Sequence, residues 1–241
     1  MICYVTAPDT TRFRVSEFLF EYVPALAPRV CFRNADRLLD GEWPDARTWI
    51  FIGLDTQTSA QARSELLAIE AHLRSDGRRI LNAPSRTLRP PELHGRLREA
   101  GIAMASEYNV KSEVGGMYHG VYRRFSVLRL GSRYIARQLQ FSRDRQVVVD
   151  QALTMEETAF VGLRQPGVPL PDIVRAFEIA EIEYGQLDYA LQQAKLGAPQ
   201  VWDIDINPFV MPRLGRMNSL RHKIQKVVAK RVCDAFEALL K

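Results

Sequence analysis

The sequence predicts an α/β fold in its first half and an α+β arrangement, an antiparallel sheet with flanking helices, in its second half. Short apolar runs first alternate with amphipathic segments, which is typical of strands and helices in a parallel sheet. A long strand pair around Gly131 and Ser132 then indicates a hairpin. Two further strand-like segments, residues 186–192 and 200–207, carry the aspartates of a candidate site.

The elements of the first half follow from its hydrophobic pattern. Strands are predicted at residues 2–6, 29–32, 48–54 and 79–82. The third is continuously apolar from Trp49 to Ile52, as expected of an inner strand that is covered on both faces. Helices are predicted at residues 15–26, 59–75 and 90–100. The second of these has an expected buried stripe of Leu66, Leu67, Ile69 and Leu73.

The second half begins with the hairpin over residues 121–141. Helices are predicted at residues 155–163 and 171–184, before the two aspartate-bearing strands. Residues 214–240 form a basic amphipathic helix with apolar residues along one stripe. No aromatic residues interleave its basic run, so we interpret that run as a solvated face and expect no nucleic-acid partner.

Composition narrows the class of protein. A net charge of +5 gives a mild preference for anionic partners such as nucleotides. No apolar stretch approaches the roughly 20 residues that span a bilayer, so we expect no membrane partner. Cys3, Cys31 and Cys233 form no CxxC pair, and reduced thiols are typical of cytoplasmic proteins. The apolar start of the chain is short and uncharged and is not interpreted as a signal peptide, so a cytoplasmic location is expected.

The acidic residues cluster if the last two strands form a hairpin. Alternation along a strand puts Asp203 and Asp205 on one face. With Leu187 opposite Ile204 and Tyr189 opposite Trp202, apolar residues share the other face. The same register places Asp188 opposite Asp203. Crowded carboxylates need a cation, and oxygen ligands suit magnesium. The alternative is a solvent-facing acidic edge without metal.

The segments YGQLDYAL and QVWDIDINP, at residues 184–191 and 200–208, resemble the ATP-grasp superfamily, in its bacterial carboxylate–amine ligase-like branch. ILNAP at residues 80–84 resembles the family's linker before the ATP-binding part, and GVYRRFS at residues 120–126 resembles the hairpin that follows. The resemblance implies a Rossmann-like pre-ATP-grasp domain over residues 1–88. It implies a truncated ATP-grasp domain over residues 89–241.

The resemblance also implies cofactors and roles. Magnesium that bridges ATP phosphates is held by Asp188, Asp203 and Asp205. Adenine lies near Glu107, Tyr108 and Val110, for which an ordinary sheet strand is the alternative. Arg124 and Arg137 face the phosphates, or else belong to a solvated basic face. The implied reaction phosphorylates a small-molecule or peptide carboxylate to an acylphosphate, which an amine or similar nucleophile attacks.

The sequence departs from the family pattern. Asp203 replaces a usual Glu, Asp205 a usual Asn, and Gln186 a usual Arg. The small lobe that clamps the nucleotide is expected after Ile102 and is missing. Three explanations stay open: a degenerate ATP-grasp protein, nucleotide binding with help from a partner chain, or a stretch of the natural protein that this sequence lacks.

Three functions compete. The first is an ATP-dependent carboxylate–amine ligase. The second is a non-catalytic ATP-grasp-like module that binds a partner or an anionic ligand. A homo-oligomer and a complex with a partner protein are both left open as assemblies of the chain. The third is a metal- and nucleotide-sugar-dependent transferase, because Asp-x-Asp at a strand end also occurs there. The Tyr-Gly-x-x-Asp-Tyr segment from Tyr184 and the Asn-Pro pair at Asn207 argue against the third.

Overall fold

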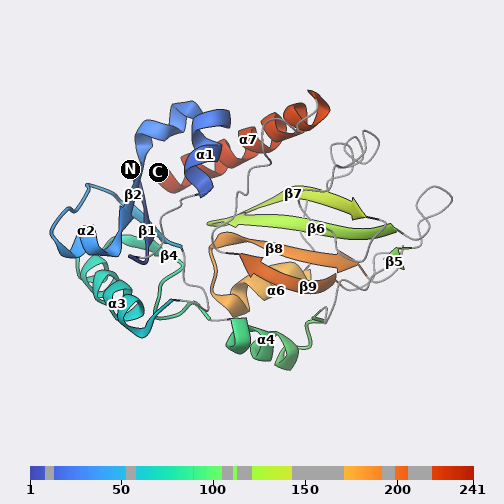
Figure 1. The fold of residues 1–241 in the computed structure, drawn as a ribbon, viewed down its shortest axis with the longest axis horizontal. Coiled ribbons are helices and arrows are strands. Elements are labelled where there is room, and N and C mark those ends of the chain that lie inside the picture. Colours follow the sequence, from blue (N-terminus) through green and yellow to red (C-terminus); the bar gives the residue numbers. More distant parts are fainter. Residues whose placement is uncertain are drawn as a thin grey trace.

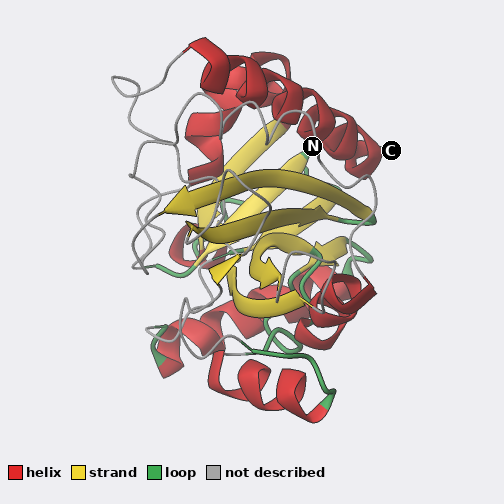
Figure 2. Cartoon of the chain, turned by 90° about the vertical axis from the view of Figure 1, so that its right-hand side faces the viewer, coloured by secondary structure: helices red, strands yellow, loops and turns green. Residues whose placement is uncertain are grey.

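The structure is a computed structural model that describes residues 1–8, 14–52, 58–88, 90–104, 111–112, 121–142, 171–191, 199–205 and 219–241. It contains two sheets: a parallel sheet near both chain ends and an antiparallel sheet on the other side of the molecule (Figure 1). Figure 2 shows the strands as a middle layer between two groups of helices. The predicted combination of a parallel and an antiparallel sheet is therefore confirmed.

The parallel sheet has the strand order β2-β1-β3-β4. Its strands are β1 (Ile2–Thr6), β2 (Val30–Asn34), β3 (Thr48–Phe51) and β4 (Arg79–Leu81). Along β1, Cys3 and Val5 are buried in one apolar cluster with α3 (Ala60–Ser75), whereas Ile2 and Tyr4 are buried in a second. The second cluster contains α1 (Arg14–Tyr22) and α7 (Ser219–Leu240). Both faces of the sheet are covered, which explains its continuous apolar strands.

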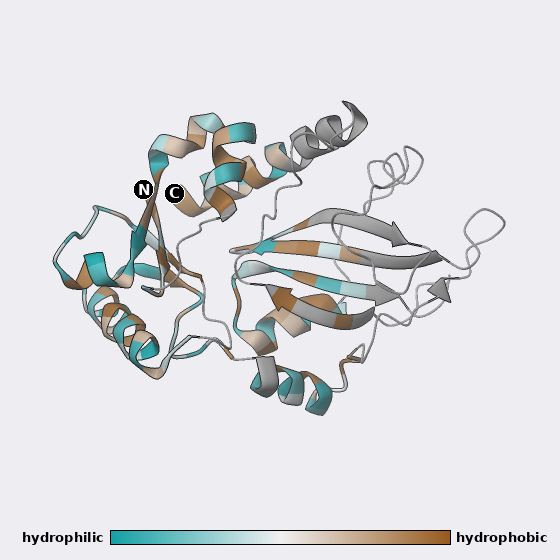
Figure 3. Ribbon diagram, viewed as in Figure 1, coloured by the Kyte–Doolittle hydropathy of each residue, from teal (hydrophilic) through white to brown (hydrophobic). Residues whose placement is uncertain are grey.

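Two helix predictions in this half need correction. The helix predicted over residues 15–26 ends at Tyr22, and a 3-10 helix, η1 (Pro24–Arg29), follows. The reason is Pro24, which has no N–H to donate and disfavours helical geometry in the residue before it. In α3, Leu67 is 37% exposed rather than buried. The buried stripe consists of Ala62, Leu66, Ile69, Glu70 and Leu73. Teal and brown turns alternate along this helix (Figure 3).

A short helix, α2 (Ala35–Leu39), escapes the sequence analysis because it is little more than one turn long. The long helix α3 begins as predicted. Ser59 is its N-cap, and its hydroxyl accepts a bond of 3.1 Å from the Ala62 N–H. The predicted helix over residues 90–100 is α4 (Pro90–Glu99).

The antiparallel sheet contains β5 (Lys111–Ser112), β6 (Val121–Leu130), β7 (Arg133–Ser142), β8 (Tyr184–Leu191) and β9 (Pro199–Asp205). The hairpin prediction is confirmed by β6 and β7. Their turn is at Gly131, whose φ of 59° is the left-handed conformation that favours glycine. A Cβ on Gly131 would meet Leu239 Cδ2 of α7 at 2.9 Å, so α7 closes over the turn.

The helix predicted over residues 171–184 is α6 (Pro171–Ala180), which ends four residues early. Glu181 takes a φ of 54° there, and the Ile182 N–H bonds back to the Phe177 carbonyl at 3.1 Å. Tyr184 can therefore start β8. The helix predicted over residues 155–163 lies outside the described residues. The terminal helix predicted from residue 214 is described from Ser219.

The two sheets are joined by buried side chains. One apolar cluster contains Trp49 and Leu187, and the other contains Tyr4 and Tyr184, so each draws residues from both sheets. The rings of Tyr4 and Tyr184 meet edge to face at 5.2 Å. The division of the chain at residue 88 stays a prediction.

Candidate functional site

A row of polar positions crosses the antiparallel sheet. Ser126 of β6 pairs with Asp188 of β8, which pairs with Asp203 of β9. Ser126 and Asp188 are 3% and 4% exposed. The Ser126 hydroxyl donates a hydrogen bond of 2.5 Å to Asp188 Oδ1. A second bond of 3.0 Å to the same oxygen comes from the Gln186 amide. The orientation of the Asp188 carboxylate is thus constrained by two neutral donors.

The next row along the same strands is apolar. Leu187 pairs with both Val127 and Ile204, and all three side chains are buried. They belong to the cluster that also contains Phe177 of α6. Because successive strand residues face opposite ways, packing of this row against the helices turns Asp188 to the other face. The predicted pairing of Leu187 with Ile204, and of Asp188 with Asp203, is confirmed.

The predicted pairing of Tyr189 with Trp202 is wrong. Tyr189 pairs with Val201, and Trp202 is the extra residue of a β-bulge. The Tyr189 ring instead stacks on Phe125 with 5.2 Å between ring centroids. Burial raises the pKa of Tyr189 to about 12, so its phenol stays protonated near neutral pH.

A second bulge lies in β7. Ser126 pairs with Gln138 and Val127 with Ala136, so Arg137 is the extra residue. The two bulges flank the row of Ser126 and Asp188, one on each side along the strands. Bulges are over-represented next to active sites because they redirect a strand locally. This arrangement marks the row as a candidate functional site on backbone geometry alone.

The predicted site residues are only partly within the described structure. Arg124 pairs with Gln140 along the hairpin, but the side chains of both candidate arginines lie outside the described residues. The same holds for the side chains of Asp203 and Asp205. Glu107, Tyr108 and Val110 lie wholly outside. Among the side chains that the structure does describe, no three His, Cys, Asp or Glu residues gather as a metal site.

Sequence reasoning missed the part played by Ser126. The residue lies in the GVYRRFS segment between Phe125 and Val127, both of which face the buried core. A small hydroxyl flanked by apolar residues on a long strand was the available signal, because it indicates a polar position on the opposite face. Gln186, noted as a departure from the family pattern, is part of the same network.

The comparisons with known proteins support the fold. Neither a protein-family model nor a curated protein matches the sequence. Solved structures of PsnB, an ATP-grasp ligase, do match. Its complex with precursor peptide PsnA2 and AMPPNP has a TM-score of 0.53 at 14% identity, over 100% of this chain and 97% of PsnB. Its complex with minimal precursor, Mg and ADP has a TM-score of 0.52 at 14% identity, over the same shares.

The chain has an ATP-grasp fold. Within this fold the aspartate row lies on the antiparallel sheet, whereas the parallel sheet carries no residue of that row. The Rossmann-like description of the parallel sheet and the loss of the small lobe stay predictions. In the described part of the chain, no helix combines the length and apolarity needed to cross a membrane.

Proposed function

We propose that this protein is an ATP- and Mg²⁺-dependent ligase that activates a carboxylate as an acylphosphate and joins it to an amine or similar nucleophile. The observation that carries the proposal is the row of Ser126, Asp188 and Asp203 in an ATP-grasp fold. A buried carboxylate opposite a second one is costly unless a cation neutralises the pair. The row therefore supports a divalent cation at this position.

The proposed ligands of the cation are Asp188, Asp203 and Asp205. Their donor set contains oxygen alone, which suits Mg²⁺, a cation that commonly shares its coordination with phosphates. The register of β8 and β9 supports this set of ligands. Asp203 of β9 pairs with Asp188 of β8, and Asp205 of β9 pairs with Gln186 of β8. Bound Mg²⁺ would neutralise charge on the transferring phosphoryl group.

The remaining roles concern the nucleotide. Arg124 and Arg137 are proposed to bind phosphate oxygens. The β-bulge at Arg137, next to the pairing of Ser126, supports the choice of that arginine. Glu107, Tyr108 and Val110 are proposed to contact adenine. Gln186 has a different role from the arginine expected there, since its amide donates to Asp188 Oδ1 and restricts that carboxylate. We expect the phosphate-binding cations to come from the hairpin rather than from residue 186.

The proposed substrate class is a peptide or small-molecule carboxylate. PsnB is solved with precursor peptide and AMPPNP, and with minimal precursor, Mg and ADP. These complexes support a peptide carboxylate as the first class to assay for this chain. Fold likeness at this identity does not choose the acceptor amine.

A non-catalytic nucleotide- or partner-binding module is the second candidate function. The observation that favours it is the neutral Gln186 at the family's arginine position, hydrogen-bonded within the protein. Such a module would bind Mg-ATP without producing ADP. Binding and turnover therefore have to be measured separately.

Calorimetric titration with ATP and Mg²⁺ tests the proposal. The wild-type protein should release or absorb heat and melt at a higher temperature, by an amount that grows with ligand concentration. Asp203→Asn should abolish the Mg²⁺-dependent part, whereas Asp36→Asn, a change at an exposed position of α2, should leave it intact. ADP release with a peptide carboxylate and an amine would support the ligase. Binding without ADP release would support a nucleotide-binding module. No heat with an unchanged melting curve would exclude the ligase.

A further inference from the structure

A polar pocket lies between the two halves of the fold, away from the aspartate row. Its volume is about 350 Å³. Its lining comprises four arginines, three glutamates and two apolar residues: Arg74, Arg78, Arg86, Arg129, Glu178, Glu181, Glu183, Ile80 and Ala83. Glu183 precedes Asp188 by five residues, roughly 16 Å along an extended strand, so the two sites are separate.

Apart from Arg129 of β6, the charges of this pocket are segregated by wall. Arg74 and Arg78 come from the end of α3 and the turn after it, and Arg86 follows β4. All three glutamates come from the last turn of α6 and the segment that leads into β8. A basic wall from the first half of the chain thus faces an acidic wall from the second. The pocket presents complementary charges across a gap rather than a single-sign field.

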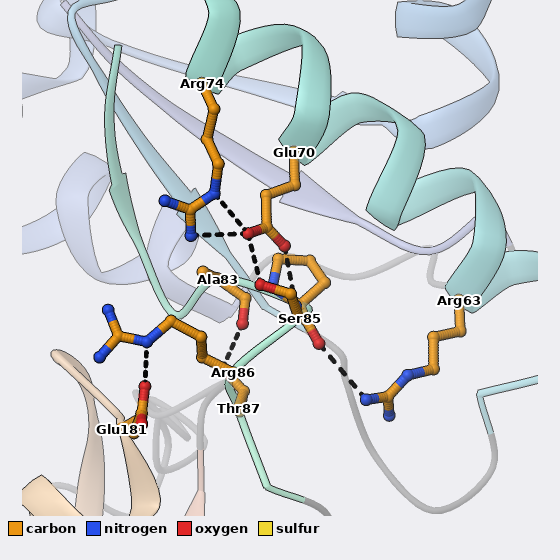
Figure 4. Close-up of polar contacts among 9 residues, drawn as sticks. Arg63, Glu70, Arg74, Ala83, Ser85, Arg86, Thr87 and Glu181 are labelled. Atoms are coloured by element: carbon orange, nitrogen blue, oxygen red, sulfur yellow. Dashed lines mark hydrogen bonds and ion pairs between the residues drawn. The ribbon is translucent and has the colours of Figure 1, made fainter. Parts of the chain in front are cut away.

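The basic wall is positioned by a buried carboxylate. Glu70 is 3% exposed, and its Oε1 accepts bonds of 2.8 Å and 2.7 Å from Nε and Nη2 of Arg74. Ser85 donates to the same carboxylate from its hydroxyl at 2.6 Å and its backbone N–H at 2.8 Å. Figure 4 shows this network holding the Arg74 guanidinium. Arg74 is therefore oriented before any ligand arrives, which lowers the cost of binding.

The contacts within the pocket leave polar groups of both walls available to bind a ligand. Arg86 reaches Glu181 across the pocket as an ion pair (Figure 4). Arg129 is engaged elsewhere: its Nε donates to the Gly131 carbonyl at 3.1 Å, and its guanidinium lies over Tyr134. In the described part of the chain, Glu178 and Glu183 form no ion pair. Arg78 makes one bond of 3.3 Å to a carbonyl and one loose ion pair at 3.6 Å.

We propose that this pocket binds a zwitterionic ligand of the size of an amino acid or a dipeptide. The carboxylate of the ligand contacts Arg74 and Arg78, and its ammonium contacts Glu178 and Glu183. A simple anion would meet three carboxylates, and a simple cation four guanidinium groups, so both are disfavoured. A ligand with both charges matches both walls at once. The volume lies at the lower end of the range for small-molecule sites.

This inference goes beyond the proposed function and needs neither ATP nor Mg²⁺. The test is calorimetric titration of the full chain with glycylglycine in the absence of nucleotide and metal. N-acetylglycylglycine lacks the ammonium and glycylglycinamide lacks the carboxylate. Each should bind about tenfold more weakly or worse, because each loses one charge-assisted pair.

Variants assign each end of the ligand. Arg78→Gln should abolish the preference for glycylglycine over glycylglycinamide. Glu183→Gln should abolish the preference for glycylglycine over N-acetylglycylglycine. Glu178→Gln gives a second acidic-wall variant if Glu183→Gln unfolds. Arg133→Gln, an exposed change on β7, should leave both preferences intact. Undetectable binding up to roughly 10 mM dipeptide, or equal binding of all three compounds, would overturn the proposal.

Discussion

Replacing Asn82 should destabilise the junction between the two sheets. Asn82 follows β4, is 1% exposed and has a φ of 54°. Its amide nitrogen donates to the carbonyls of Phe51 at 3.1 Å and Tyr184 at 2.6 Å. Its amide oxygen accepts from the N–H groups of Glu183 at 2.9 Å and Tyr184 at 3.0 Å. One side chain thus links the end of β3 to the start of β8.

The magnitude follows from these four bonds. Each contributes about 1 kcal/mol net, and their loss leaves backbone groups unpaired in the interior. Asn82→Ala also places an alanine in the left-handed conformation, at a cost of about 1 kcal/mol. We expect the free energy of unfolding to fall by about 5 kcal/mol. That is a large fraction of the roughly 5–15 kcal/mol typical of a folded protein.

Two further variants separate the contributions. Asn82→Gly loses the same bonds but tolerates the positive φ, so it should be less destabilising than Asn82→Ala by about 1 kcal/mol. Asn34→Ala is the matched control. Asn34 accepts one described bond, 3.2 Å from the Thr6 hydroxyl, and its loss should cost about 1 kcal/mol.

Urea unfolding followed by intrinsic fluorescence measures all three. The midpoint should shift while the slope with urea stays constant, since the surface exposed on unfolding is unchanged. If Asn82→Ala lost no more stability than Asn34→Ala, the buried amide would not join the sheets energetically. Equal values for Asn82→Ala and Asn82→Gly would refute the argument from φ.

Three other predictions rest on local contacts. Gly131→Ala should lower the free energy of unfolding by about 2 kcal/mol, because of the positive φ and the clash of the new Cβ with Leu239. A urea midpoint equal to that of the wild type would contradict this. Burial raises the pKa of Glu70, but bonds from Ser85 and Arg74 outweigh it and lower that pKa. Its stabilisation is therefore present above the unfolded pKa and lost as pH falls through the folded one. Glu70→Gln should cost stability at about pH 7, and this cost should shrink as the solution is acidified. A difference in urea midpoints that stayed constant with pH would argue against this. A hydrogen bond with Cys3 lowers the pKa of Cys31 despite burial. Iodoacetamide should therefore alkylate Cys31 before the other cysteines as pH rises. Peptide mass spectrometry that found Cys3 or Cys233 modified first would count against this.

Local patterns carry much of this architecture. The strands of the parallel sheet, the hairpin around Gly131 and the pairing of Asp188 with Asp203 all follow from apolar periodicity and turn residues in the sequence. Periodicity works here because burial of one face selects the register of a strand, and a slip by one residue would expose the whole apolar set. The position of the aspartate row is therefore encoded locally.

Bulges are not encoded in that way. Trp202 and Arg137 are extra residues in β9 and β7, and their neighbours have ordinary strand composition. An alternating pattern carries no mark of the point at which one residue is skipped, so the Tyr189 pairing was predicted one position off. The backbone geometry of the full sheet decides where the skip falls.

The sequence by itself determined the strands of the parallel sheet, the hairpin and the longer helices, and which face of β8 is polar. Only the tertiary structure decided which distant residues meet. Asn82 bonds to Tyr184, 102 residues later, and Glu70 to Ser85. Arginines in and after α3 line the same pocket as glutamates in and after α6. Partners so far apart leave no periodic signal, because their pairing depends on how the two sheets pack and not on the pattern of either one.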